Sequence, residues 1–171
     1  MNLGINFEGL SKPQLITRLT AAIWNDGFGC FTRAGFEKVI WPEIVGRARY
    51  IVYFDVDNVK KINDLHGTYD VFNEMMRQAL ASMRSDDYVA SQWNSGDEFL
   101  IALCETDQPK NDRRQRLDPE AFIERLTAEL DKQGLAAIFW FGPVVHQDLV
   151  SNVKPMADKV LEIKKQRGIS R

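Results

Sequence analysis

The chain has 171 residues, 44% of them hydrophobic, which suffices for one domain with its own core and is too few for two. Its 22 basic and 24 acidic residues leave a net charge of −2, which excludes the strongly basic surface of a dedicated nucleic-acid-binding protein. No apolar run reaches the roughly 20 residues of a membrane span, and the first residues lack the pattern of a signal peptide. We therefore expect a cytoplasmic protein with neither nucleic acid nor membrane as a partner.

Two helices are expected ahead of the first strand. Residues 10–22 have Ser11 as an N-cap and Pro13 in the first turn, and both residue types are favoured at helix starts. Thr32 can cap a second helix that runs towards Trp41. The sheet is therefore predicted to begin only after both helices.

The first predicted strand is residues 50–54, a continuous run of aromatic and β-branched side chains that is typical of a strand buried on both faces. Asp55 then emerges at the C-terminal end of this strand. Residues 59–65 and 69–83 follow with the apolar spacing of helices.

Two further strands, residues 88–93 and 98–104, are predicted to form a β-hairpin, because the intervening Asn-Ser-Gly-Asp is a turn sequence. Asp97 and Glu98 then lie at the hairpin tip. A tight turn with two carboxylates can share metal ions with a strand-end aspartate such as Asp55. This combination predicts a phosphoryl-transfer site.

The remainder alternates again between helix and strand. Polar residues 105–118 are expected as a solvated loop, residues 119–132 as an amphipathic helix capped by Asp118, residues 135–141 as a buried strand and residues 153–167 as a closing basic helix. The predicted fold class is a mixed α/β sheet flanked by helices. 

The two cysteines do not have the spacing of metal ligands. Cys30 and Cys104 both lie in apolar surroundings, so we expect buried, reduced thiols.

Two segments carry a family resemblance. Residues 54–67 (Phe-Asp-Val-Asp-Asn-Val-Lys-Lys-Ile-Asn-Asp-Leu-His-Gly) and 95–99 (Ser-Gly-Asp-Glu-Phe) resemble the signature motifs of the GGDEF domain, the family of diguanylate cyclases. Residues 29–36 and 157–168 resemble its first and last segments. The resemblance covers residues 25–171, which leaves residues 1–24 as an N-terminal helical extension. It implies a fold related to the polymerase palm.

The resemblance also implies an activity and a metal. Members of the family condense two GTP molecules into cyclic di-GMP and release pyrophosphate, which requires a homodimer in which each subunit presents one triphosphate. Asp55, the backbone carbonyl of Val56, Asp97 and Glu98 correspond to the ligands of Mg²⁺ or Mn²⁺, which favours such oxygen ligands. Asp97 and Glu98 are the candidate catalytic residues, with Glu98 as ligand or as the group that helps to deprotonate the attacking hydroxyl.

Three further residues correspond to positions that contact the phosphates. Gly96 allows the backbone to approach them, and the ammonium groups of Lys60 and Lys165 match positions that bind the triphosphate. Ile169 stands where the family usually has an arginine, so Arg167 or Arg171 would have to replace that arginine.

Base recognition is where the chain departs most from the family. Asn63 matches the asparagine that reads guanine, but Phe72 replaces the expected aspartate. Asp70 and Asn73 are rotated away from Phe72 by about 100° per residue, so neither is expected to replace the lost acceptor. Phe72 can stack on a base or fill the core. GTP is the substrate by resemblance, and a different purine nucleotide stays open.

Arg84 and Asp87 have the Arg-x-x-Asp form of the family's product-inhibition site, and a plain salt bridge at a helix end is the alternative. Two functions remain. The first is a dinucleotide cyclase, favoured by the presence of all three carboxylates. The second is a degenerate domain that binds nucleotide or a partner protein without turnover, favoured by Phe72 and Ile169.

Overall fold

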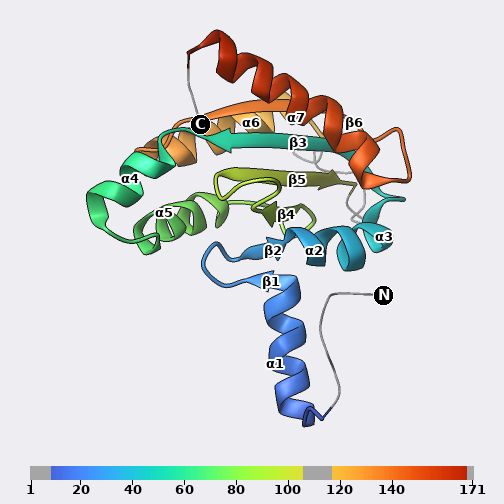
Figure 1. Ribbon diagram of the computed structural model, residues 1–171. Helices are drawn as coiled ribbons and strands as arrows, with labels where there is room; N and C mark the ends of the chain where they lie inside the picture. The colour runs from blue at the N-terminus through green and yellow to red at the C-terminus, as the bar shows by residue number, and fades with distance from the viewer. Residues whose placement is uncertain (1–8, 106–116, 169–171) are drawn as a thin grey trace.

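The computed structural model describes residues 9–105 and 117–168. Its six strands form one mixed sheet in the order β1-β2-β4-β5-β3-β6 (Figure 1), in which β2 and β4 are parallel and every other pair is antiparallel. The strands are β1 (Trp24–Asn25), β2 (Cys30–Thr32), β3 (Ala48–Val56), β4 (Tyr88–Ser91), β5 (Glu98–Cys104) and β6 (Ala137–Pro143). The predicted mixed α/β class is confirmed.

The helices flank this sheet. They are α1 (Lys12–Ile23), α2 (Arg33–Gly35), the π-helix η1 (Phe36–Ile40), α3 (Trp41–Ile44), α4 (Val59–His66), α5 (Asp70–Leu80), α6 (Pro119–Lys132) and α7 (Leu149–Gln166). Ser11, Thr32 and Asp118 cap their helices as predicted. None of the described helices combines the length and apolar character of a membrane span.

Strand β3 is the centre of the sheet, with β5 on one side and β6 on the other. Because side chains alternate along a strand, β3 contributes to two cores. Val52 and Phe54 pack with α5 and α6 on one face, whereas Ile51 and Tyr53 pack with η1, α3 and α7 on the other. Burial on both faces explains why the strand reads as one continuous apolar run.

The prediction that both N-terminal helices precede every strand was wrong. Strands β1 and β2 lie between α1 and α2 and extend the sheet beyond β4. Strands of two and three residues are too short to show an alternating pattern, so no periodic signal marks them in the sequence.

Other differences concern element boundaries. Strand β4 ends at Ser91 rather than residue 93, because Gln92 takes a left-handed conformation (φ 55°) that interrupts pairing. Helix α7 begins at Leu149, where Asp148 caps it, four residues before the predicted start. The predicted loop at residues 105–118 lies almost entirely outside the described residues.

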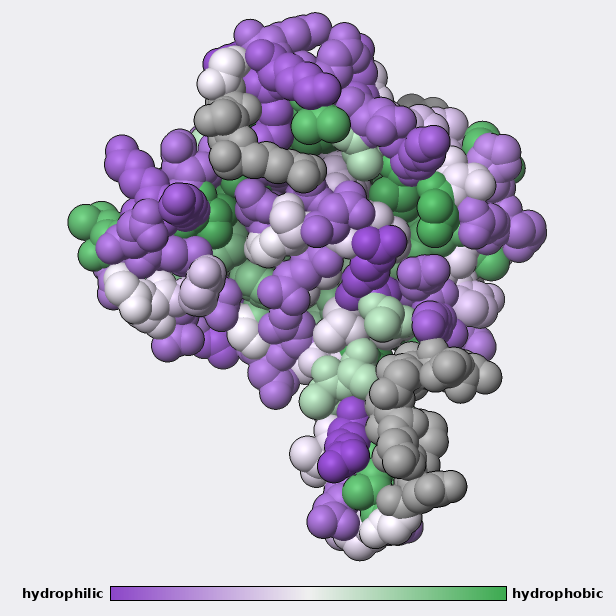
Figure 2. All heavy atoms as spheres, in the orientation of Figure 1, coloured by the Kyte–Doolittle hydropathy of each residue, from purple (hydrophilic) through white to green (hydrophobic). Residues whose placement is uncertain are grey.

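Helix α1 extends away from the sheet at the β1 edge, and none of its residues is buried (Figure 1). Its C-terminal end meets α2, where a Cβ atom on Gly35 would clash with the Ile23 backbone. Figure 2 shows a largely hydrophilic surface in this view, with small separate hydrophobic areas, some of them on α1. Strand β1 crosses the predicted boundary between residues 1–24 and 25–171, because Trp24 lies on one side of it and Asn25 on the other. This division of the chain stays a prediction.

Candidate functional site

Asp55 is the penultimate residue of β3 and lies in the buried part of this strand. Its Oδ1 accepts a hydrogen bond from Nζ of Lys164 on α7 at 2.6 Å, and the two side chains are only 4% and 8% exposed. The pKa of the Asp55 carboxyl is raised to about 6, mainly by burial; the bond to Lys164 opposes this rise, and the charges of Asp97 and Glu98 contribute to it.

Glu98 begins β5 directly opposite Asp55 in the sheet register. Its Oε2 accepts from the backbone N–H of Asn94 at 3.0 Å, and the side chain also hydrogen-bonds the Tyr53 hydroxyl. Asn94 Nδ2 donates to that hydroxyl at 3.0 Å. Burial, followed by the contact with Glu98, raises the pKa of Tyr53 above its usual range, so Tyr53 stays a hydrogen-bond donor.

Asp97 lies at the hairpin tip as predicted. Its backbone carbonyl accepts from the N–H of Val56 at 2.9 Å, which fastens the tip to the end of β3. Its carboxylate accepts a hydrogen bond from the Ser95 hydroxyl. The end of β3 and the hairpin therefore bring Asp55, Asp97 and Glu98 to the same edge of the sheet.

In the present arrangement, the three carboxylates are not placed to bind one shared divalent cation. Asp55 is paired with an ammonium group, and Glu98 and Asp97 each bond to neighbouring protein donors. Among residues 9–105 and 117–168, no three His, Cys, Asp or Glu side chains are gathered closely enough to hold one metal ion. Binding of Mg²⁺ or Mn²⁺ by Asp55, Val56, Asp97 and Glu98 stays a prediction.

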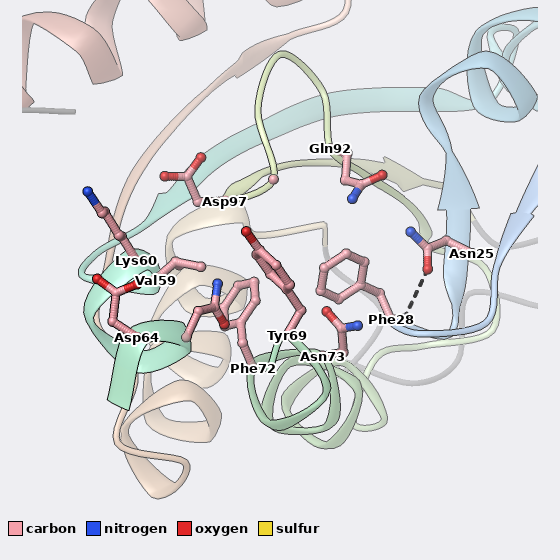
Figure 3. Close-up of a pocket in the computed structure, with 12 residues that line it drawn as sticks. Asn25, Phe28, Val59, Lys60, Asp64, Tyr69, Phe72, Asn73, Gln92 and Asp97 are labelled. Carbon is pink, nitrogen blue, oxygen red and sulfur yellow. Dashed lines mark hydrogen bonds between the residues drawn. The ribbon is translucent and has the colours of Figure 1, made fainter. Parts of the chain in front are cut away.

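A cavity of about 500 Å³ opens beside the hairpin tip (Figure 3). We call it the carboxamide cavity because four of its lining side chains are Asn or Gln. Helices α4 and α5, the β1–β2 turn and the β4–β5 hairpin supply its walls. Its lining residues are Asn25, Phe28, Val59, Lys60, Asn63, Asp64, Tyr69, Phe72, Asn73, Gln92, Gly96 and Asp97.

Five residues predicted from the sequence line this cavity: Lys60, Asn63, Phe72, Gly96 and Asp97. Oδ1 of Asn63 is buried and has no hydrogen-bond partner within the described part of the chain. Apart from the two chain neighbours of Gly96, no atom of the described residues lies within 4 Å of where a Cβ on Gly96 would be, so there is open space beside the backbone there.

Phe72 is 1% exposed and meets Phe28 edge-on, with 5.7 Å between ring centroids. It belongs to the core and also forms part of the cavity wall. Its neighbour Asn73 lines the same cavity, contrary to the prediction that it points elsewhere. The cavity is broad enough for two successive helix positions to reach it.

Lys165 is exposed, whereas Lys164 is buried and reaches Asp55. The sequence did contain a signal for Lys164. Val153, Met156 and Val160 precede it at helical spacing on the buried face of α7, so Lys164 falls on the same face. Sequence reasoning also missed Tyr53 and Asn94.

Arg84 and Asp87 form a two-pronged ion pair, with Nε to Oδ2 at 2.8 Å and Nη2 to Oδ1 at 2.6 Å. The Asp87 side chain is fully buried and also accepts from the backbone N–H of Cys104 at 3.4 Å. This is the salt-bridge alternative, and it ties the start of β4 to the end of β5. A product-inhibition role for the pair stays a prediction.

Ile169, which stands where the family usually has an arginine, lies outside the described residues.

Cys30 and Cys104 are free and buried, as predicted. Burial is the largest cause that raises the pKa of each thiol to about 11. Neither thiol is therefore a nucleophile at neutral pH.

No protein-family model matches the sequence, and no curated protein matches it. Solved structures do. The diguanylate cyclase SiaD of Pseudomonas aeruginosa, in complex with its activator SiaC, matches with a TM-score of 0.64 at 22% identity, over 91% of this chain and 65% of that chain. 

Two structures with cyclic di-GMP are also similar. A microbial GGDEF domain that interacts with cyclic di-GMP matches with a TM-score of 0.62 at 19% identity, over 84% of this chain and 94% of that one. The GGDEF domain of DgcB from Caulobacter crescentus, in complex with cyclic di-GMP, matches with a TM-score of 0.58 at 16% identity, over 86% and 89%. The protein therefore has the fold of a GGDEF domain.

Proposed function

We propose that this chain is a GGDEF-fold binding domain that takes up a purine nucleotide in the carboxamide cavity without turning it over. The observation that carries the proposal is the buried Oδ1 of Asn63, which has no hydrogen-bond partner among residues 9–105 and 117–168 and lies in the wall of a cavity of about 500 Å³. A buried acceptor without a donor costs about 1–3 kcal/mol, and a ligand N–H removes that cost. The volume is in the range of small-molecule sites.

The walls of the cavity suit the two ends of a nucleotide. Phe28 and Tyr69 offer aromatic surface to a base, and Asn63 and Asn73 offer donors and acceptors to its polar edge. In Figure 3, Lys60 and Asp97 lie on the side opposite Asn25. The Lys60 ammonium is exposed there and can meet phosphate oxygens.

The absence of turnover rests on Asp55. The strand-end carboxylate that a cyclase would need for catalysis already accepts a hydrogen bond from Lys164. Phe72, which cannot accept from guanine, supports a base preference different from that of the family. The base is therefore proposed only as a purine.

A second candidate, cyclisation of two nucleotides by a homodimer, is favoured by one observation. Asp55 and Glu98 face each other across the β3–β5 pair, with Asp97 next to Glu98, which is where the resemblance places the reacting residues. Rearrangement of Lys164 would then be part of activation.

The test is a binding panel combined with product analysis. Isothermal titration with ATP, GTP, CTP, UTP and cyclic di-GMP is expected to show binding of a purine nucleotide in preference to the pyrimidines. Asn63→Ala is expected to weaken it about tenfold, for one lost hydrogen bond to a buried acceptor. Gln78→Ala is the control. It removes an exposed carboxamide of α5 that is not among the lining residues of the cavity, and this variant is expected to bind nucleotide like wild type.

Mass spectrometry after incubation with each triphosphate and Mg²⁺ or Mn²⁺ separates the two candidates. Unchanged triphosphates support the binding domain. A cyclic dinucleotide that disappears in Glu98→Gln would establish the cyclase instead. If no nucleotide binds to wild type at all, both candidates are wrong.

A further inference from the structure

The Asp55 end of the site contains a cation that belongs to the protein itself. Nζ of Lys164 is 2.6 Å from Asp55 Oδ1, and Lys164 is the one basic residue that is buried within residues 9–105 and 117–168. The ammonium stands beside the carboxylates for which the resemblance implies divalent metal. We propose that Lys164 is a tethered substitute for that metal, so that this end of the site is filled by the ammonium and does not take up a divalent cation.

The local charge explains why a buried cation is stabilised here. Asp55 and Glu98 are both buried and lie opposite each other in the β3–β5 register, and Asp97 is the neighbour of Glu98 in the chain. Several carboxylates that converge in a partly buried site repel one another unless a positive charge lies among them. The Lys164 ammonium supplies that charge without any ion from solution.

The helix holds the ammonium in this position. Val153, Met156 and Val160 are buried against the sheet at helical spacing, and Lys164 continues the same face of α7. The side chain therefore reaches Asp55 from a fixed backbone, and it is 8% exposed. To withdraw, it would have to leave a buried ion pair, which strands the Asp55 charge.

The space that remains next to the pair is small. A cavity of about 110 Å³ lies between α7 and the ends of β3 and β5, lined by Tyr53, Asp55, Asn94, Glu98 and Lys164 among others. A divalent ion that entered it would lie within a few ångströms of the ammonium, and like charges at that separation repel strongly in a site shielded from water. Lys164 and a divalent ion at Asp55 therefore exclude each other.

The proposal is tested with the metal alone, without nucleotide, so its failure is distinguishable from failure of the proposed function. Mn²⁺ binding to wild type, Lys164→Met and Lys154→Met is followed by electron paramagnetic resonance, and thermal unfolding is recorded in EDTA and in millimolar Mg²⁺. Wild type and Lys154→Met, which changes an exposed lysine of the same helix, are expected to show no Mn²⁺ site and no shift in Tm.

Lys164→Met keeps the aliphatic length but removes the charge. It is expected to unfold at a lower temperature in EDTA, to gain roughly tenfold or more in Mn²⁺ affinity, and to recover roughly 5 °C in Tm when Mg²⁺ is present. The double variant Asp55→Asn with Lys164→Met removes both charges. It is expected to lose the metal response while regaining stability in EDTA.

One result that does not depend on the Lys164→Met variant can overturn the proposal. A Mn²⁺ site in wild type that is lost in Asp55→Asn would show that metal and Lys164 share the site, whether or not the Lys164→Met variant folds. A folded Lys164→Met protein that gains no metal affinity would show equally that the ammonium does not stand in for a metal.

Discussion

The two halves of the site differ in how their polar groups are satisfied. The carboxamide cavity is open and about 500 Å³ in volume, and its wall contains Oδ1 of Asn63, which has no partner in the described part of the chain. The Asp55 half lies next to it, at the end of β3 and the start of β5. Helix α7 covers this half, and its Lys164 forms an ion pair with Asp55. The open half has polar groups available to a ligand, whereas the closed half supplies its own partners, so the proposed function assigns ligand recognition to the α4–α5 side.

The largest effect should come from breaking the closed half. Asp55→Ala leaves the Lys164 ammonium buried without its partner, so we expect a loss of about 3–5 kcal/mol in the free energy of unfolding. Urea denaturation monitored by circular dichroism measures it. Asp158→Ala, an exposed aspartate on α7, is the control and should change stability little. Equal losses in the two variants would contradict the account of the pair.

The closed half should also respond to pH. Because folding raises the pKa of Asp55 to about 6, protonated Asp55 favours the folded state. That contribution to stability is complete below the unfolded pKa near 4 and is lost as the pH rises through about 6. NMR titration of the Asp55 carboxyl carbon should give a midpoint near 6, and a higher one in Lys164→Met. A midpoint near 4 in wild type would contradict the burial argument.

In the open half, Tyr69→Ala should weaken purine binding about tenfold, because base stacking on an aromatic ring contributes roughly 1–3 kcal/mol. Tyr69 is 71% exposed, so its removal should leave stability unchanged. Trp140→Ala, a partly exposed aromatic residue on β6, is the matched control in the same titration. If the two variants bind alike, the base does not lie against Tyr69.

The smallest effect is expected at the entrance. Lys60→Ala should reduce affinity about two- to fivefold, and less at high salt, because an exposed ammonium gains little from a phosphate in water. Lys61→Ala, its exposed neighbour outside the cavity lining, should bind like wild type at every salt concentration. A salt-independent loss at Lys60 would point to a structural role.

The sequence predicted the long elements because they are strongly periodic. The strand at residues 50–54, the hairpin around Asp97 and the helix at residues 119–132 are all present. The short strands β1 and β2 were not predicted, because they are defined by pairing with the rest of the sheet and not by a local sequence pattern. The walls of the carboxamide cavity contributed by Asn25 and Phe28 were missed for the same reason.

The carboxylates of the site were predicted from the sequence, but their hydrogen-bond partners were missed. Asp55 and Glu98 could be placed at one edge because strand ends and turns leave a local signal. Lys164 contacts Asp55 across 109 positions of the chain, and the motif drew attention to Lys165 instead. Which of two adjacent lysines faces the sheet depends on the phase of α7, which the spacing of Val153, Met156 and Val160 indicates, but the motif match was given more weight than that spacing.

Titration of GTP and ATP into the wild-type protein, once in EDTA and once in Mg²⁺, tests the central claim most directly. An open cavity beside a tethered ammonium predicts that a purine nucleotide binds in EDTA at least as tightly as in Mg²⁺. Binding that occurs only when Mg²⁺ is present, or no binding under either condition, would contradict it.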